Sequence, residues 1–141
     1  YNKDVLNFDN SNKYDFIILY MPCSSVGTIR KNPEIFFKKK GPDLENLKVM
    51  QQKMLEKAST LLNKNGLILY MVCSFLHEET FKQIDIFLKK NKNFKINNFY
   101  LNKNNPDHKQ FIKKNILFTM PTKFKDYYID GYFAVYLRKN N

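Results

Sequence analysis

The hydrophobic residues of this chain form short uninterrupted runs. In the segments between some of these runs, apolar residues recur at helical spacing. Two runs, residues 16–19 and 67–72, are rich in β-branched and aromatic side chains and are bounded by turn residues. Such runs predict buried parallel strands, which lack polar alternation because helices cover both faces of their sheet. We expect active-site residues at the C-terminal ends of these strands, where open α/β sheets bind their ligands.

Apolar positions between the two predicted strands recur at helical spacing. This pattern predicts a long helix that begins at Asp43 and ends at a glycine stop formed by residues 63–66. A second helix is predicted after Ser74, with Glu78 and Glu79 in its first turn, where carboxylates stabilise the positive end of the helix dipole.

Three further apolar runs, residues 94–100, 116–120 and 132–137, predict the remaining strands, and residues 101–109 predict a polar loop. The succession strand, helix, strand, helix predicts an α/β fold in one domain or in part of one. Neither a G-x-G-x-x-G nor a P-loop pattern occurs in the sequence. A nucleotide or cofactor pocket built from this chain alone is therefore expected to be incomplete.

The charge of the chain is strongly positive, with 24 Lys and Arg against 13 Asp and Glu and a formal net charge of +11. This excess favours a polyanionic partner such as RNA. Nearly all of the positive charge is lysine, and asparagine, isoleucine and phenylalanine are also abundant. An A/T-rich coding sequence produces the same profile, so both origins of the charge stay open.

The sequence also gives expectations about the cellular compartment and about metal binding. No apolar stretch approaches the roughly 20 residues of a membrane span, and the N-terminus shows no signal-peptide pattern. We expect a cytoplasmic protein with no membrane partner. Two cysteines in such a protein predict reduced thiols, and without a nearby histidine pair they predict no metal site.

Cys23 and Cys73 each lie just after the end of an apolar run that predicts a strand, and a serine follows each of them. Two thiols placed together fit the demands of methylation at carbon 5 of a pyrimidine. One thiolate adds to carbon 6 and makes carbon 5 nucleophilic, and a second group helps to expel that thiolate afterwards. The alternative is that both cysteines are ordinary small buried side chains.

The sequence around the cysteines resembles the RNA 5-methylcytosine methyltransferases, most closely their Sun/Fmu (RsmB) branch, which modifies small-subunit ribosomal RNA. Residues 22–35 resemble the family's Pro-Cys-Ser motif with its glycine, basic pair and proline. Residues 72–79 resemble its Thr-Cys-Ser motif with the following Glu-Glu, residues 130–133 resemble its closing Asp-Gly-Phe-Phe, and Gln51 matches a family glutamine. The likeness extends over residues 4–139.

The resemblance implies a Rossmann-like, S-adenosylmethionine-dependent methyltransferase fold that acts on RNA, with ribosomal RNA the expected substrate. It makes Cys73 the nucleophile and Cys23 the residue that assists release. This order differs from that of DNA cytosine methyltransferases, whose nucleophile lies in the Pro-Cys motif. By the same resemblance, the cofactor-binding residues are Asp4, Tyr20 and Pro22, and the RNA-binding residues are Arg30 and Lys31.

The chain departs from the family pattern in three ways. Tyr20 and Met21 stand where the family has an aspartate and an alanine, and the glycine-rich cofactor loop and early strands have no counterpart. The family's usual N-terminal RNA-binding domain has no counterpart either. Residues 1–141 are therefore expected to form only the C-terminal portion of the catalytic domain, with an uncovered sheet edge on its first strand. A missing N-terminal half or self-association would cover it. The alternative function is an inactive remnant that serves as an RNA-binding or assembly module.

For several other residues an ordinary structural role is favoured over a role in catalysis or binding. His77 and His108 are expected to be solvated rather than to shuttle protons or bind metal. The lysines at 38–40 predict a soluble face. Tyr127 and Tyr128 could stack on a flipped base, but packing beside the last strand is the favoured interpretation.

Overall fold

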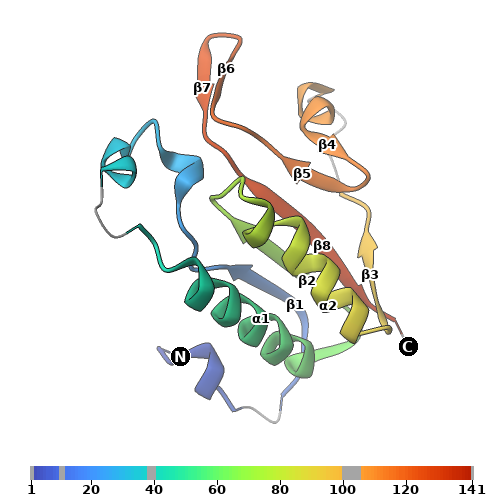
Figure 1. Ribbon diagram of the computed structural model, residues 1–141. Helices are drawn as coiled ribbons and strands as arrows, with labels where there is room; N and C mark the ends of the chain where they lie inside the picture. The colour runs from blue at the N-terminus through green and yellow to red at the C-terminus, as the bar shows by residue number, and fades with distance from the viewer. Residues whose placement is uncertain (1, 10–11, 38–40, 100–105, 141) are drawn as a thin grey trace.

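A mixed β-sheet with two helices packed on one of its faces forms the body of the molecule (Figure 1). The structure is a computed structural model that describes residues 2–9, 12–37, 41–99 and 106–140, with only the backbone at 106–108. The sheet consists of β1 (Tyr14–Tyr20), β2 (Leu62–Val72), β3 (Phe94–Asn97), β4 (Ile112–Lys113), β5 (Ile116–Phe118) and β8 (Phe133–Lys139). Two further strands, β6 (Thr122–Phe124) and β7 (Tyr127–Ile129), form a separate hairpin.

The strands lie in the order β1, β2, β8, β5, β4, and β3 also pairs with β8. The pairing of β1 with β2 is parallel, as expected, with Tyr20 opposite Met71 at the C-terminal ends. Strand β8 runs antiparallel to β2, β3 and β5. The two cysteine-bearing strand ends therefore lie side by side, which is the arrangement that the sequence predicts.

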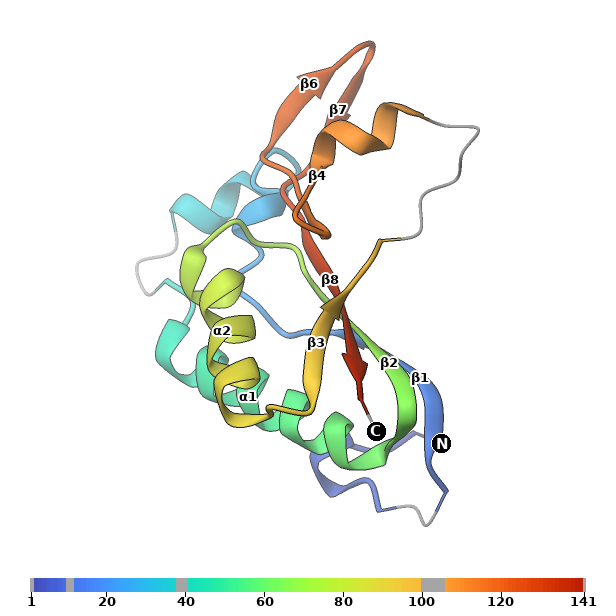
Figure 2. The same ribbon diagram turned by 90° about the vertical axis from the view of Figure 1, so that its right-hand side faces the viewer.

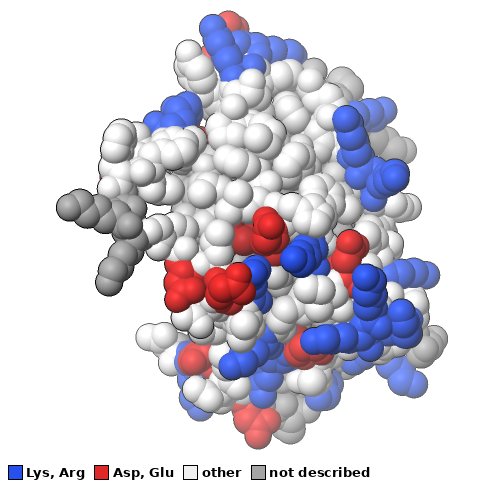
Figure 3. Space-filling view, in the orientation of Figure 1, with Lys and Arg blue, Asp and Glu red and all other residues white. Residues whose placement is uncertain are grey.

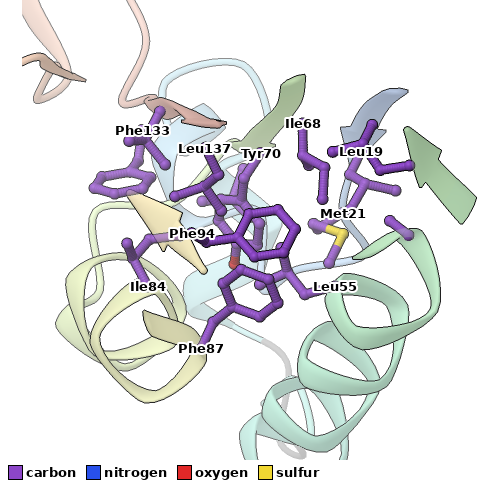
Figure 4. Close-up of a cluster of buried hydrophobic side chains, with 14 residues drawn as sticks. Leu19, Met21, Leu55, Ile68, Tyr70, Ile84, Phe87, Phe94, Phe133 and Leu137 are labelled. Carbon is purple, nitrogen blue, oxygen red and sulfur yellow. The ribbon is translucent and has the colours of Figure 1, made fainter. Parts of the chain in front are cut away.

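Both α-helices, α1 (Leu44–Leu61) and α2 (Phe81–Lys90), lie on the same side of the sheet (Figure 2). Short 3-10 turns complete the fold: η1 (Val5–Asn7), η2 (Val26–Thr28), η3 (Pro33–Phe36), η4 (His77–Glu79) and η5 (Pro106–Phe111). The core lies between the helices and the sheet, where Leu55 and Phe87 meet Ile68, Tyr70 and Phe133 (Figure 4). No described helix is both long enough and apolar enough to cross a membrane.

Helix α1 begins as predicted, because the Asp43 side chain accepts a hydrogen bond from the Asn46 backbone N–H. The predicted glycine stop is wrong, since β2 follows the helix directly. Asn65, with φ of 61°, takes the left-handed conformation in place of Gly66. The ammonium of Lys139 donates to two carbonyls at the end of α1 and thus replaces the glycine cap.

Helix α2 begins at Phe81, later than predicted. Glu78 and Glu79 lie in η4, which precedes it. Glu79 is fully buried, whereas a carboxylate in an exposed first turn would face water. Its role is therefore a tertiary one, described with the candidate site below.

The strand predicted over residues 94–100 ends at Asn97, and residues 101–105 of the expected loop lie outside the described part of the chain. The two last predicted strands correspond to β5 and β8, but the hairpin β6–β7 was not predicted. Each of its strands has three residues, too few for a periodic signal.

The face of the sheet opposite the helices exposes apolar side chains of β1. Phe16 is 46% exposed and Ile18 is 59% exposed, so the expectation that β1 is buried on both faces is wrong. Within the described chain β1 is an edge strand, which agrees with the expected uncovered edge. Exposed apolar surface of this kind is typical of places where a protein contacts another molecule.

Candidate active site

The C-terminal ends of β1 and β2 bring the two cysteines together. Their Sγ atoms lie 3.3 Å apart, although the residues are 50 positions apart in the sequence. A backbone hydrogen bond from Met21 to Met71, 2.9 Å long, continues the parallel pairing just before both cysteines. Cys23 is half-buried and Cys73 is buried, and both are free thiols.

The surroundings of the two thiols separate their pKa values. The hydrogen bond from Cys23, followed by those from Tyr20 and Ser25, lowers the pKa of Cys73 to about 5, although burial acts in the opposite direction. The same contact with Cys73, together with burial, raises the pKa of Cys23 above its ordinary value. At neutral pH the pair therefore consists of a Cys73 thiolate beside a Cys23 thiol, as nucleophilic chemistry requires.

This arrangement predicts the pH dependence of the nucleophile. Because the pKa of Cys73 is lowered, its thiolate persists at neutral pH and is protonated as the pH falls through about 5. We expect the ultraviolet absorbance of the thiolate to follow this midpoint. In Cys23→Ala the midpoint should rise toward the ordinary value of 9.0, because the largest stabilising hydrogen bond is lost. An unchanged midpoint in Cys23→Ala would contradict the assignment.

The buried carboxylate of Glu79 holds the loop that carries Cys23. Its oxygens accept hydrogen bonds from the Ser24 backbone N–H at 2.8 Å and from the Ser24 hydroxyl at 2.5 Å. Gln51 of α1 donates to the Pro22 carbonyl at 2.9 Å and to Glu79 at 3.3 Å. These contacts connect the two cysteine motifs to the intervening helix, so Glu79 is a positioning residue that the sequence did not single out.

Gly27 is the point where three segments of the site cross. Its backbone N–H donates to the Cys73 carbonyl at 3.0 Å, and its carbonyl accepts from the Gly131 N–H at 2.7 Å. A side chain here would overlap the carbonyl oxygen of Gly131 and lie 2.9 Å from the Cys73 carbonyl carbon. Glycine is therefore required at position 27 for the close approach of these backbones.

Arg30 and Lys31, expected to contact RNA, both reach the buried carboxylate of Asp130. Lys31 Nζ lies 2.7 Å from Asp130 Oδ2, and Arg30 Nη2 lies 3.4 Å from Asp130 Oδ1. The lysine side chain remains well exposed. The two ion pairs connect the loop that carries Arg30 and Lys31 to the segment before β8. The carboxylate of Asp130 partly compensates the positive charge of both side chains. The position of Asp130 in the Asp-Gly motif is the sequence signal that could have identified this pairing.

A cavity of about 700 Å³ brings together two of the three proposed cofactor residues. Asp4 and Pro22 line it with Cys23, and α1 supplies its remaining wall. The other lining residues are Val5, Pro42, Asp43, Asn46, Leu47, Met50 and Met54. Apolar walls with a few carboxylate and amide groups suit a flat heterocycle with polar edges.

Tyr20 does not line this cavity. Its hydroxyl is hydrogen bonded to Cys73, which is the largest cause of its raised pKa.

Exposed His77 stacks on Phe81, and the His108 side chain and residues 38–40 lie outside what the structure describes. Within the described residues no group of three or more His, Cys, Asp and Glu could hold a metal ion.

Comparison with known proteins adds independent evidence. The family described as 16S rRNA methyltransferase RsmB/F matches residues 1–138. Ribosomal RNA small subunit methyltransferase B of Pasteurella multocida (strain Pm70) is 38% identical over 84 residues, which cover 60% of this chain and 19% of that protein. Its counterpart in Shewanella oneidensis is 34% identical over 96 residues, which cover 66% of this chain and 22% of that protein.

Among solved structures, NSun6 from Pyrococcus horikoshii, solved with SFG, shares the fold. Its TM-score is 0.76 at 20% identity, over 99% of this chain and 34% of that one. Together with the family match, this likeness confirms the Rossmann-like methyltransferase fold expected from the sequence. The chain spans about a fifth of the length of the curated relatives that it matches.

Proposed function

The chain belongs to the RsmB/F family of 16S rRNA methyltransferases, and we propose that it carries the cysteine-bearing part of an enzyme that methylates carbon 5 of cytosine in RNA. The observation that supports this most strongly is the contact of the two thiols. Their Sγ atoms lie 3.3 Å apart, and the hydrogen bond from Cys23 lowers the pKa of Cys73. Ribosomal RNA is the proposed substrate.

The proposed chemistry assigns one role to each cysteine. The Cys73 thiolate adds to carbon 6 of cytosine, and the electrons of the 5,6 double bond move so that carbon 5 becomes nucleophilic. S-adenosylmethionine, when bound, supplies the methyl group. Transfer of the proton from carbon 5 to water restores the double bond and expels the Cys73 thiolate. Cys23 lies next to the departing sulfur, and its thiol stabilises the thiolate by hydrogen bonding.

The cavity beside Cys23 is the proposed cofactor site, with Asp4 and Pro22 in its lining. Tyr20 contributes differently from the family's aspartate, because it brings no negative charge at neutral pH and its hydroxyl hydrogen bonds to Cys73. The exposed apolar side chains of β1 support a further proposal, namely that polypeptide outside this chain covers that face and completes the cofactor site.

Trapping of a covalent intermediate tests the proposed function. In Cys23→Ala the Cys73 thiolate can still attack cytosine at a pH near or above its raised pKa, but release is impaired. We expect a protein–RNA adduct that survives denaturing electrophoresis when this variant is mixed with RNA and S-adenosylmethionine. The double variant with Cys73→Ala should form none. Lack of any adduct in a preparation that binds S-adenosylmethionine would refute the cysteine roles.

Calorimetric titration of S-adenosylmethionine separates the enzyme from the alternative of an inactive RNA-binding remnant. Micromolar binding by the chain supports the enzyme, because the remnant has no use for the cofactor. If binding appears only after a longer homologous segment is added, the site is shared with polypeptide outside this chain.

A further inference from the structure

The hairpin β6–β7 stands away from the body of the molecule, close to the end of the sheet that carries the cysteines (Figures 1 and 2). Its register pairs Lys123 with Tyr128 and Phe124 with Tyr127. Paired residues share a face of a hairpin and neighbouring residues point to opposite faces. One face therefore presents Lys123 and Tyr128, and the other presents Phe124 and Tyr127.

Both tyrosines are exposed, Tyr127 by 73% and Tyr128 by 61%. The interpretation favoured by the sequence, packing beside the last strand, is therefore wrong for both. Phe124 packs against Phe111 with ring centroids 5.2 Å apart, so the hairpin is attached to η5 through this contact. Neither tyrosine is needed for that attachment.

Tyr128 is adjacent to the loop that follows Cys23. The guanidinium carbon of Arg30 lies 5.4 Å from the centre of its ring, a cation–π distance. Arg30 itself is held by Asp130, so the guanidinium is fixed over the ring. Tyr128 also lines a cavity of about 490 Å³, together with Lys31 and Tyr132. The ring is thus oriented by a cation and still open to a ligand.

Three cations, Arg30, Lys31 and Lys123, lie near Tyr128, and the carboxylate of Asp130, which pairs with the first two, also lines its cavity. Lys123 lies across the hairpin from it, and Lys31 shares its cavity. Figure 3 shows a few Lys and Arg side chains at the top of the molecule, where the hairpin stands, with an acidic side chain beside them. An open aromatic ring among fixed cations is the combination with which proteins bind single-stranded nucleic acid, the ring stacking on a base and the cations contacting phosphates.

We propose that the Lys123–Tyr128 face of the hairpin binds unpaired RNA beside the active site, with a base stacked on Tyr128 and phosphate oxygens near Lys123 and Lys31. This inference rests on the proposed function for its substrate. It adds a contact outside the two cysteine motifs and assigns it to one side of the hairpin. The bound nucleotide neighbours the target cytosine, because Arg30 connects Tyr128 to the loop that carries Cys23.

Tyr127 provides a matched control, since it is the same residue type, is at least as exposed and faces the other way. Binding of a fluorescently labelled single-stranded oligoribonucleotide is measured by anisotropy for Tyr128→Ala, Tyr128→Phe and Tyr127→Ala. We expect about tenfold weaker binding for Tyr128→Ala, the usual cost of losing one stacked base. Tyr128→Phe and Tyr127→Ala should stay within about twofold, because they retain the stacking ring.

Lys123→Ala tests the phosphate contact separately. The affinity of this variant should depend less on salt. The magnitude of the negative slope of log affinity against log salt should decrease by about 0.7, the value for one phosphate contact on a single strand. Unchanged affinity in Tyr128→Ala, or equal losses in both tyrosine variants, would overturn the proposal. Equal losses would indicate a general apolar contact of the hairpin, such as a protein interface. Thermal unfolding of each variant verifies the fold.

The outcomes also separate this proposal from the proposed function. A Tyr128-dependent affinity for RNA without S-adenosylmethionine binding or adduct supports the hairpin site and contradicts the enzyme. An adduct in Cys23→Ala that forms equally well with Tyr128→Ala, at RNA concentrations below saturation, supports the enzyme and contradicts the hairpin site.

Discussion

Replacement of Gly27 by alanine should lower the free energy of unfolding by at least about 3 kcal/mol. The added methyl group would overlap the backbone of Gly131 and crowd that of Cys73. Both neighbours are main-chain atoms, which cannot rotate away as a side chain can. The segments must separate, and the hydrogen bonds of 3.0 Å to Cys73 and 2.7 Å from Gly131 would break. Domains have only about 5–15 kcal/mol of net stability, so this loss is large.

Thermal and denaturant unfolding measure the effect of Gly27→Ala, with an expected decrease of roughly 10 °C in Tm. Gly41→Ala is the matched control, because a methyl group there meets nothing within 4 Å. It should be neutral or slightly stabilising, since alanine restricts the unfolded chain. Equal stability of the two variants would show that the three segments do not meet as closely as described.

Glu79→Ala should lower stability by about 3 kcal/mol and also separate the two thiols. The substitution removes the acceptor of the Ser24 N–H and hydroxyl and of the Gln51 amide, all at a buried position. Each buried donor left without a partner costs about 1–3 kcal/mol. The Cys23 loop would also lose its link to η4, so the Sγ–Sγ contact of 3.3 Å should open.

Two further variants show whether the effect depends on the hydrogen bonds of the Glu79 side chain or on its negative charge. Glu79→Gln preserves the shape and one acceptor, so its loss should be about half of that for alanine. Glu78→Ala is the control, because the neighbouring carboxylate is only partly buried. The approach of the thiols is measured as the rate of disulfide formation between Cys23 and Cys73 in diamide. A wild-type rate in Glu79→Ala would exclude a positioning role for this carboxylate.

The sequence predicts the features that depend on neighbouring residues. The apolar runs before Cys23 and Cys73 predict β1 and the later part of β2, and Asp43 marks the start of α1, because strand and helix signals are local. The placement of both cysteines at strand ends predicts their meeting, since parallel neighbours end at the same edge of a sheet. Family membership likewise follows from short motifs around the two cysteines, because each motif consists of residues that are close in the sequence.

Only the tertiary structure decides what distant residues do to one another. Glu79 has the local signature of a helix start, yet its carboxylate binds Ser24, 55 positions earlier. Asp130 meets Arg30 across 100 positions, and Gly27 is constrained by a glycine that follows it by a similar interval. Whether Tyr128 packs in the core or faces solvent depends on where its hairpin stands. Burial and pairing are properties of the assembled chain, because they depend on which backbones approach in space.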